Sequence, residues 1–204
     1  MQLTHSELVQ KILGCTDCFL CEERTQAVPG SGLLEAELLF VGEGPGFYED
    51  RSGLPFVGPA GKILDELLES VGLSRKDIYI TNVVKCRPPK NRDPYPVEVE
   101  ACKPYLDEQI RMVNPRVIVS LGRFALENFF PGAKISRAKG VAREWNGRTV
   151  YPVYHPAAAL HNPGLKERLF EDFSRLPKVV SDARQNETRV IEEEKNGPKM
   201  EAMF

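Results

Sequence analysis

VGEGPGFYEDRSGLPFVGPAG, residues Val41 to Gly61, is the segment around which this chain is arranged. It follows an apolar run at 38–41 that predicts a buried strand. Three glycines between Gly42 and Gly46 let the backbone approach a ligand closely with its N–H groups exposed. A helical pattern of apolar residues begins near Pro59. Strand, glycine-rich loop and helix together predict a ligand pocket at the carboxyl end of the strand.

Two nucleotide-binding motifs are similar to this segment but do not fit it. The dinucleotide pattern G-x-G-x-x-G begins at Gly42 and Gly44, but Phe47 occupies the place of the third glycine. Phe56 and Ile63 stand where a P-loop needs glycine and then serine or threonine. We therefore do not expect a phosphate cradle of either kind. The remaining alternatives are a pocket for a small molecule or a flipped base, and a plain structural turn.

Strand and helix patterns alternate along the rest of the chain. This alternation predicts an α/β fold in which helices cover both faces of a parallel or mostly parallel sheet. Ligands of such folds bind at the carboxyl ends of the strands, where the Gly42–Phe56 loop, Asn82 and His155 are all expected. The expected strands are 38–43, 77–84, 117–121 and 149–154; the expected helices are a short one after Thr4, then 59–71, 97–113, 122–130 and 165–175; residues 22–37 are expected to form a loop.

The charge distribution divides the chain into a body and a tail. Of the 29 acidic and 27 basic residues, six and four lie in 181–204, which leaves 23 of each in the first 180 residues. We expect one domain over 1–180 and a charged, flexible tail over 181–204. Because the body is neutral, affinity for nucleic acid must come from local basic segments, of which 87–96 and 134–148 are the candidates.

The apolar segments and the N-terminus argue for a location inside the cell. No apolar run is long enough to span a membrane, and no basic N-terminal region precedes an apolar core. We expect a cytoplasmic protein that does not bind membranes, and a monomer. Five cysteines in a chain with no export signal argue against a disulfide framework.

The cysteines have the spacing of metal ligands. Cys15 and Cys18 form a C-x2-C pair, whereas 15 residues separate Cys86 from Cys102, which does not match a zinc ribbon. An iron–sulfur cluster accepts this spacing because it needs only four thiolates. Cys21 makes one thiol too many, and with Cys15 and Cys18 it repeats the first three ligands of a bacterial ferredoxin. The spacing leaves open which cysteine is spare, and zinc remains the competing metal.

Three motifs carry a resemblance to a known family. GEGPGFYEDRSGLPFVGPAG at 42–61, ITNVVKCRPPKNRDP at 80–94 and HPAAAL at 155–160 together resemble the family-4 uracil-DNA glycosylases, the thermophile type with a [4Fe–4S] cluster. The resemblance implies an α/β/α sandwich with a central four-stranded parallel sheet. It also implies removal of uracil from DNA by hydrolysis of the N-glycosidic bond after base flipping. The family's cluster ligands fall on Cys15, Cys18, Cys86 and Cys102, which leaves Cys21 as the extra thiol.

The resemblance implies roles for the residues at the strand ends. Phe56 would offer a flat apolar face to the flipped base, and the amides near Gly42 and Gly44 would add donors. Asn82 offers one acceptor and one donor, which match N3–H and O4 of uracil and reject the reversed pattern of cytosine. His155 matches the histidine that donates a hydrogen bond to uracil O2, where negative charge gathers as the base leaves.

Two carboxylates are candidates for placing the attacking water. The best-known uracil glycosylases carry an aspartate in a GQDPYH motif at the position where this chain has Gly44. Glu43 is the neighbouring carboxylate, and Glu49 matches a position near the C5 edge of uracil, where it would crowd out the methyl group of thymine. Leu160 is the candidate wedge that fills the vacated stack. Relatives that trap DNA covalently need a histidine in a basic insert, and its absence at 90–92 favours hydrolytic turnover.

Two other functions account for part of the sequence. A non-catalytic iron–sulfur electron carrier would explain the cysteines, but it would not explain Phe56, Asn82 and His155. A zinc-bound nucleic-acid module would explain the cysteines and the basic segments. Metal analysis separates these two alternatives.

The last residues indicate a second partner. Sliding-clamp ligands often place an aliphatic residue, two spacers and an aliphatic–aromatic pair, and Met200, Met203 and Phe204 have this spacing. A charged tail gains nothing by exposing such an apolar triplet. We therefore expect either a clamp-binding peptide or packing of Phe204 against its own domain.

Overall fold

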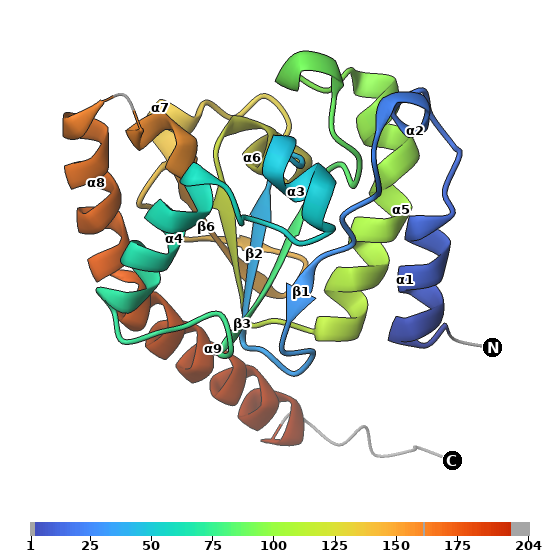
Figure 1. Cartoon of the computed structure of the whole chain (residues 1–204). Coiled ribbons are helices and arrows are strands. Elements are labelled where there is room, and N and C mark those ends of the chain that lie inside the picture. Colours follow the sequence, from blue (N-terminus) through green and yellow to red (C-terminus); the bar gives the residue numbers. More distant parts are fainter. Residues whose placement is uncertain (1–2, 161, 197–204) are drawn as a thin grey trace, which may run out of the picture.

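A six-stranded sheet lies at the centre of the molecule, with helices on both faces (Figure 1). The computed structural model describes residues 3–160 and 162–196, with side chains as far as residue 186. The strand order is β1-β3-β2-β4-β6-β5. The strands are β1 (Ser31–Gly32), β2 (Leu38–Gly42), β3 (Ile78–Asn82), β4 (Val117–Leu121), β5 (Arg143–Trp145) and β6 (Arg148–Val153).

The sheet is mixed, which differs from the expected four-stranded parallel sheet. Strands β3, β2, β4 and β6 run parallel, whereas β1 and β5 pair antiparallel at the two edges. The two edge strands are short and polar: β1 is Ser31 and Gly32 within the expected loop 22–37, and β5 is Arg-Glu-Trp. They join the sheet through backbone hydrogen bonds, so no apolar alternation marks them in the sequence.

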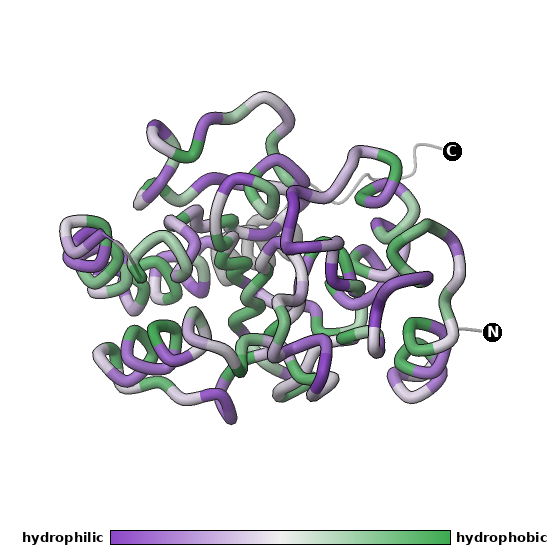
Figure 2. The backbone as a smooth tube through the Cα atoms, turned by 45° about the horizontal axis from the view of Figure 1, so that its top comes forward, coloured by the Kyte–Doolittle hydropathy of each residue, from purple (hydrophilic) through white to green (hydrophobic). Residues whose placement is uncertain are grey.

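Hydrophobic clusters on the two faces of the sheet hold the layers together. Successive side chains of β2 point to opposite faces, so Leu39 and Val41 pack on the side of α1, α5 and α6, and Leu38 and Phe40 on the side of α4, α8 and α9. Figure 2 shows the hydrophobic residues concentrated in the central strands. The helices are α1 (His5–Leu13), α2 (Leu20–Glu23), α3 (Phe47–Ser52), α4 (Pro59–Glu69), α5 (Pro96–Val113), α6 (Arg123–Phe129), α7 (Ile135–Ala138), α8 (Pro163–Ser174) and α9 (Leu176–Asn196), with the 3-10 turns η1 (Pro89–Asn91) and η2 (Pro156–Ala159).

The expected central strands and long helices are confirmed to within a few residues. Thr4 begins α1 as expected, because its hydroxyl accepts from the Glu7 amide while the Glu7 carboxylate accepts from the Thr4 amide. The structure adds two short helices, α2 in the expected loop 22–37 and α3 in the glycine-rich loop. None of the helices in the described part of the chain is long and apolar enough to cross a membrane.

Helix α9 differs from the expected flexible tail, because it crosses residue 180 without a break and is helical to Asn196. Val179, Val180 and Ala183 recur at helical spacing and pack into the hydrophobic cluster on this face of the sheet. Arg184 forms an ion pair with Glu37. The apolar stripe, rather than the net charge, therefore decides the structure of this segment. The predicted clamp-binding residues Met200, Met203 and Phe204 lie outside the described residues.

The register of the parallel strands brings distant segments together. Gly42, the last residue of β2, lies opposite Asn82, the last residue of β3. Val153 ends β6 opposite Leu121, and His155 follows two residues later. The glycine-rich loop, Asn82 and His155 therefore meet at the carboxyl edge of the sheet, as the sequence predicts.

Candidate active site

Asn82 lies at the bottom of the candidate pocket with an unused hydrogen-bond acceptor. Its side chain is 1% exposed, and its Oδ1 atom has no partner among the described residues. A Cβ atom on Gly42 would lie 2.4 Å from this Oδ1 and 2.7 Å from Cζ of Phe56, so only glycine leaves room here. Leaving a buried acceptor unpaired costs about 1–3 kcal/mol, which a ligand N–H would recover.

The backbone around Phe56 holds its ring in a fixed place. Phe56 has a φ of 53°, in the left-handed region that non-glycine residues seldom adopt. Its carbonyl lies so close to the N-terminal part of α4 that a Cβ atom on Gly61 would be 1.7 Å away. Arg75 donates to the carbonyls of both Pro55 and Phe56. The loop is therefore anchored on both sides of the aromatic ring, as a rigid platform requires.

His155 is held as a neutral imidazole beside Phe56. The two rings are stacked with centroids 5.6 Å apart and an interplanar angle of 28°. Nδ1 of His155 accepts a hydrogen bond from the Ala157 amide at 3.1 Å, so Nε2 carries the proton in the neutral ring. Burial lowers the pKa of His155 to about 4. At neutral pH this residue therefore supplies an N–H donor without a positive charge.

Gly122 allows His155 to come this close to the sheet. It has a φ of +88°, and a Cβ atom there would lie 2.9 Å from Cβ of His155. This contact was not predicted from the sequence. The signal was the glycine that follows strand β4 at the same edge of the sheet, in the turn where α6 begins.

The two candidate carboxylates have different environments. Both oxygens of Glu49 accept backbone hydrogen bonds, from Gly58 at 2.7 Å and from Gly46 at 3.1 Å, so this side chain closes the loop on itself. Glu43 is half-buried next to Gly44, and burial followed by the charge of Asp93 raises its pKa. A raised pKa and no such pair of backbone bonds leave Glu43 better suited to handle a water molecule.

Leu160 lies at the end of η2, five residues after His155. Its side chain is 39% exposed, although η2 itself packs against α4 and α8. An exposed leucine on a fixed turn beside the pocket has the placement that a wedge residue needs. The wedge role stays a prediction.

Four of the five cysteines line one apolar pocket on the other side of the molecule from α4 and α8. Cys15 and Cys18 come from the segment after α1, Cys86 from the segment after β3 and Cys102 from α5. Cys21 does not line this pocket. Among the described residues, no group of three or more possible ligands already has the geometry of a metal site. The structure thus separates Cys21 from the other four, a choice that spacing alone left open.

The surroundings of these sulfur atoms favour a bound metal group over free thiols. Nη1 of Arg24 donates to Sγ of Cys86 at 2.9 Å, and the amide of Lys85 donates to Sγ of Cys102 at 3.3 Å. Burial raises the pKa of Cys86, and it raises the pKa of Cys102 to about 11. Donors aimed at sulfur are typical of thiolates that ligate iron, whereas buried thiols without a metal stay protonated. Neither Arg24 nor Lys85 was predicted from the sequence.

The comparisons with known proteins agree with this site. Residues 29–175 match the family described as the uracil DNA glycosylase superfamily. The type-4 uracil-DNA glycosylase of Archaeoglobus fulgidus is 49% identical over 179 residues, which cover 83% of this chain and 90% of the relative. The type-4 enzymes of Thermotoga maritima and Sulfurisphaera tokodaii are 47% and 45% identical, over 86% and 85% of this chain and 92% and 84% of their own. The chain therefore belongs to the type-4 uracil-DNA glycosylases of this superfamily.

Proposed function

We propose that this chain removes uracil from DNA by hydrolysis of the N-glycosidic bond, after the nucleotide has been flipped into the pocket at the carboxyl edge of the sheet. The observation that carries the proposal is the unpaired, buried Oδ1 atom of Asn82, which Gly42 and Phe56 leave facing an apolar wall. Oδ1 accepts from N3–H of uracil, and the amide group donates to O4. Cytosine has no N3–H and presents an amino group at C4, so it would leave both groups of Asn82 badly paired.

His155 supports the departure of the base. As the glycosidic bond breaks, negative charge moves onto uracil O2, and the Nε2–H of neutral His155 donates to it. Such a donor is worth about 3 kcal/mol in a site from which water is excluded. We assign Glu43 the task of orienting water toward the sugar, and Glu49 the task of holding the loop, because both oxygens of Glu49 are engaged by backbone amides.

We also propose that a [4Fe–4S] cluster is held by Cys15, Cys18, Cys86 and Cys102. The lining of the apolar pocket and the two donors to sulfur support this assignment. The group would supply cross-links between the N-terminal segment, the end of β3 and α5. The electron-carrier and zinc-module alternatives do not account for the pocket at Asn82.

The proposed partner is uracil-containing DNA, single- or double-stranded. A sliding clamp that binds Met200, Met203 and Phe204 stays a proposal from sequence spacing. Localisation in the cytoplasm and a monomeric state likewise stay predictions.

The test is to incubate the protein with oligonucleotides that differ only in one uracil, cytosine or thymine, and to measure abasic sites. Parent protein should produce them at uracil alone. Asn82→Asp should lower kcat/KM on uracil by about 100-fold, because two hydrogen bonds of about 1.5 kcal/mol each are disturbed. It should also weaken discrimination against cytosine, since a protonated carboxyl offers the reversed donor pattern.

Asn146→Asp is the matched control, because Asn146 is exposed in the turn between β5 and β6 at the opposite edge of the sheet. It should leave excision unchanged. Parent-level uracil turnover in Asn82→Asp would remove Asn82 from the role of base reader.

A further inference from the structure

The basic segment from Lys134 to Arg143 forms a pocket that the base-binding site does not use. The pocket has a volume of about 350 Å³, and its lining includes the side chains of Lys134, Arg137 and Arg143. Small apolar residues, Ala133, Ala138 and Val141, make up the rest of the side-chain lining, and no carboxylate lines it. Three like charges around one cavity repel one another, so the pocket favours an anion.

These three cations differ from the other basic residues at this end of the molecule. In the second basic segment, Arg92 is paired with Glu98, and Nε of Arg87 donates to Asn91. Lys134, Arg137 and Arg143 are exposed and form no ion pair within the described part of the chain. The guanidinium of Arg143 lies 4.3 Å from the ring centroid of Phe130, which orients its plane without using its N–H donors.

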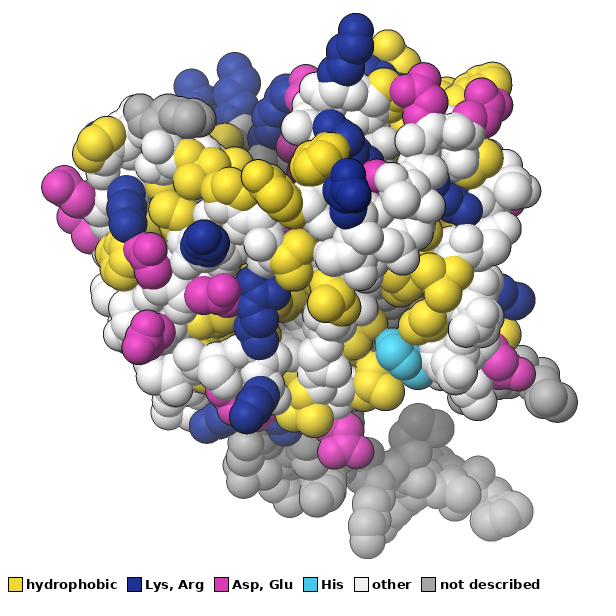
Figure 3. All heavy atoms as spheres, in the orientation of Figure 1, with side chains coloured by type: hydrophobic (Ala, Val, Ile, Leu, Met, Phe, Trp, Pro, Cys, Tyr) yellow, Lys and Arg dark blue, Asp and Glu magenta, His cyan; other side chains and the backbone are white. Residues whose placement is uncertain are grey.

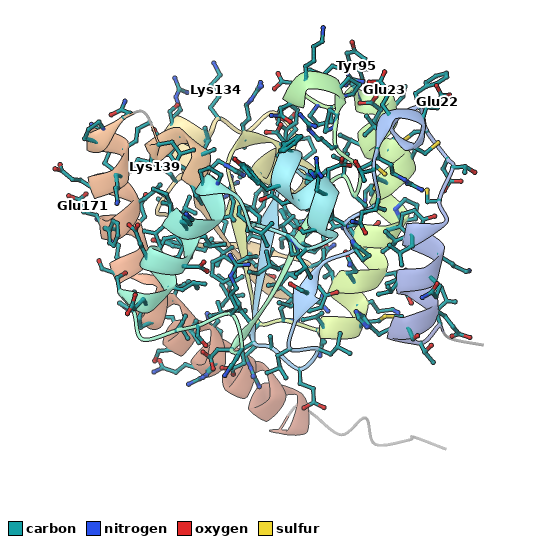
Figure 4. All side chains as sticks on the ribbon, viewed as in Figure 1. Glu22, Glu23, Tyr95, Lys134, Lys139 and Glu171 are labelled. Atoms are coloured by element: carbon teal, nitrogen blue, oxygen red, sulfur yellow. The ribbon has the colours of Figure 1, made fainter. Side chains whose placement is uncertain are left out.

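The pocket lies beside the strand that carries His155. The Gly140 amide donates to the carbonyl of Pro152 at 2.8 Å, and Nζ of Lys139 lies 5.6 Å from the ring centroid of Tyr154. Figure 4 shows Lys134 at the top edge of the molecule and Lys139 below it beside α8. Figure 3 shows Lys and Arg side chains along the same top edge, where the strands have their carboxyl ends.

We propose that Lys134, Arg137 and Arg143 bind a phosphodiester group of the DNA strand, outside the nucleotide that enters the base pocket. The proposal rests on the proposed function for the choice of DNA as the anion. A phosphate takes several N–H donors at once, and a cavity with apolar walls and three unpaired cations matches that chemistry. The contact positions the strand and reads no sequence.

The salt dependence of binding tests this proposal. Affinity for a uracil-free duplex is measured by fluorescence anisotropy over a range of salt concentrations, so the readout needs no excision. The triple variant Lys134→Gln, Arg137→Gln, Arg143→Gln should give a log–log slope shallower by about 0.9 for each phosphate lost. Its single-turnover excision rate at saturating DNA should stay within roughly twofold of the parent rate, since no reacting group is changed.

Lys76→Gln is the control, because Lys76 is exposed and precedes β3 at the opposite edge of the sheet. It should not change the slope. A triple variant with the slope of the parent and of Lys76→Gln would overturn the phosphate site. A changed slope in a protein that does not excise uracil would keep the site and defeat the proposed function instead.

A second inference comes from Lys85, a fully buried lysine that the proposed mechanism does not use. It is 1% exposed, and all three of its N–H donors are engaged. Nζ donates to Oγ1 of Thr81 at 2.8 Å, to the carbonyl of Asn82 at 2.6 Å and to Oε1 of Gln109 at 2.7 Å. Thr81 and Gln109 are themselves fixed, because both donate to the carbonyl of Pro29.

Lys85 connects the cysteine pocket with the base pocket. Its amide donates to Sγ of Cys102, and its side chain returns along β3 to the carbonyl of Asn82. Burying an ammonium group is costly, and its full set of short hydrogen bonds offsets that cost only in this one geometry. The geometry points to Lys85 as a positioning residue that fixes the backbone of Asn82, and through it the direction of Oδ1. This inference also rests on the proposed function.

Lys85→Met tests the inference, because methionine fills the space but donates nothing. The uracil-over-cytosine ratio of kcat/KM should fall at least about tenfold, as expected when one buried hydrogen bond of about 1.5 kcal/mol no longer fixes the base reader. Affinity for free uracil should fall in parallel, a readout that needs no catalysis. Iron content should match the parent, since the contact with Cys102 is made by the main chain.

Thr81→Val is the control: it removes one acceptor from Nζ and keeps the contact with Asn82. It should lower Tm but preserve both the ratio and the affinity. If Lys85→Met fails to fold, Lys85→Gln, which retains a shorter donor, provides the same comparison below its Tm. Unchanged base discrimination and uracil affinity in the folded Lys85 variant would reduce Lys85 to a structural role.

Discussion

His155→Ala lowers the single-turnover rate of uracil excision by about 100- to 1000-fold, the usual loss when one preorganised donor to a developing oxyanion is removed. Binding of DNA changes far less, because the contact strengthens only as charge moves onto the leaving base. The expectation depends on the hydrogen bond from the Ala157 amide to Nδ1, which leaves the proton on Nε2. Single-turnover kinetics beside equilibrium binding constants measure both quantities. Equal losses in rate and binding would leave His155 only a positioning role.

The same residue predicts a pH dependence. Burial lowers the pKa of His155 to about 4, below the ordinary value of 6.5 for an exposed histidine side chain. The unfolded chain therefore binds more protons than the native state between pH 6.5 and about 4, and stability is lost as pH falls through this window. Tm of His155→Ala should accordingly depend less on pH in this range than Tm of the parent. His5→Ala, on α1 and away from the pocket, is the control for loss of rate.

Cys86→Ser loses its iron–sulfur colour and its stability together. Cys15, Cys18, Cys86 and Cys102 come from three segments of the chain, so the proposed cluster closes long loops. A cross-link over loops of this length stabilises by about 3–5 kcal/mol, which corresponds to a fall in Tm of about 10 °C when it is lost. Iron and sulfide analysis, absorption spectra and thermal melts measure the effect.

Cys21→Ser is the matched control, because Cys21 lies outside the lining of the cysteine pocket. It should retain iron, sulfide and Tm. Loss of colour in Cys21→Ser with retention in Cys86→Ser would reverse the ligand assignment. Zinc in place of iron and sulfide in the purified protein would replace the cluster with the competing metal.

Local patterns in the chain predicted the arrangement of the central strands and the place of the pocket. The apolar run before Gly42 and the β-branched run before Asn82 indicate buried strands, because such runs are stable only inside a sheet covered on both faces. Once the strands are parallel, their carboxyl ends must share an edge, so the order of the strands along the chain is enough to place Asn82 and His155 together. The edge strands β1 and β5 escaped because backbone pairing leaves no side-chain pattern.

The roles of individual side chains depend on contacts between distant segments, and only the folded chain decides those. Spacing counted five cysteines, but packing of α1 and α5 left Cys21 outside the pocket. Glu43 and Glu49 are equivalent carboxylates in the sequence, whereas in the folded chain backbone amides of the loop engage both oxygens of Glu49. The tautomer of His155 follows from one amide two residues away, set by the turn of η2. A hydrogen bond needs a partner within about 3 Å in the right direction, and sequence patterns carry no such direction.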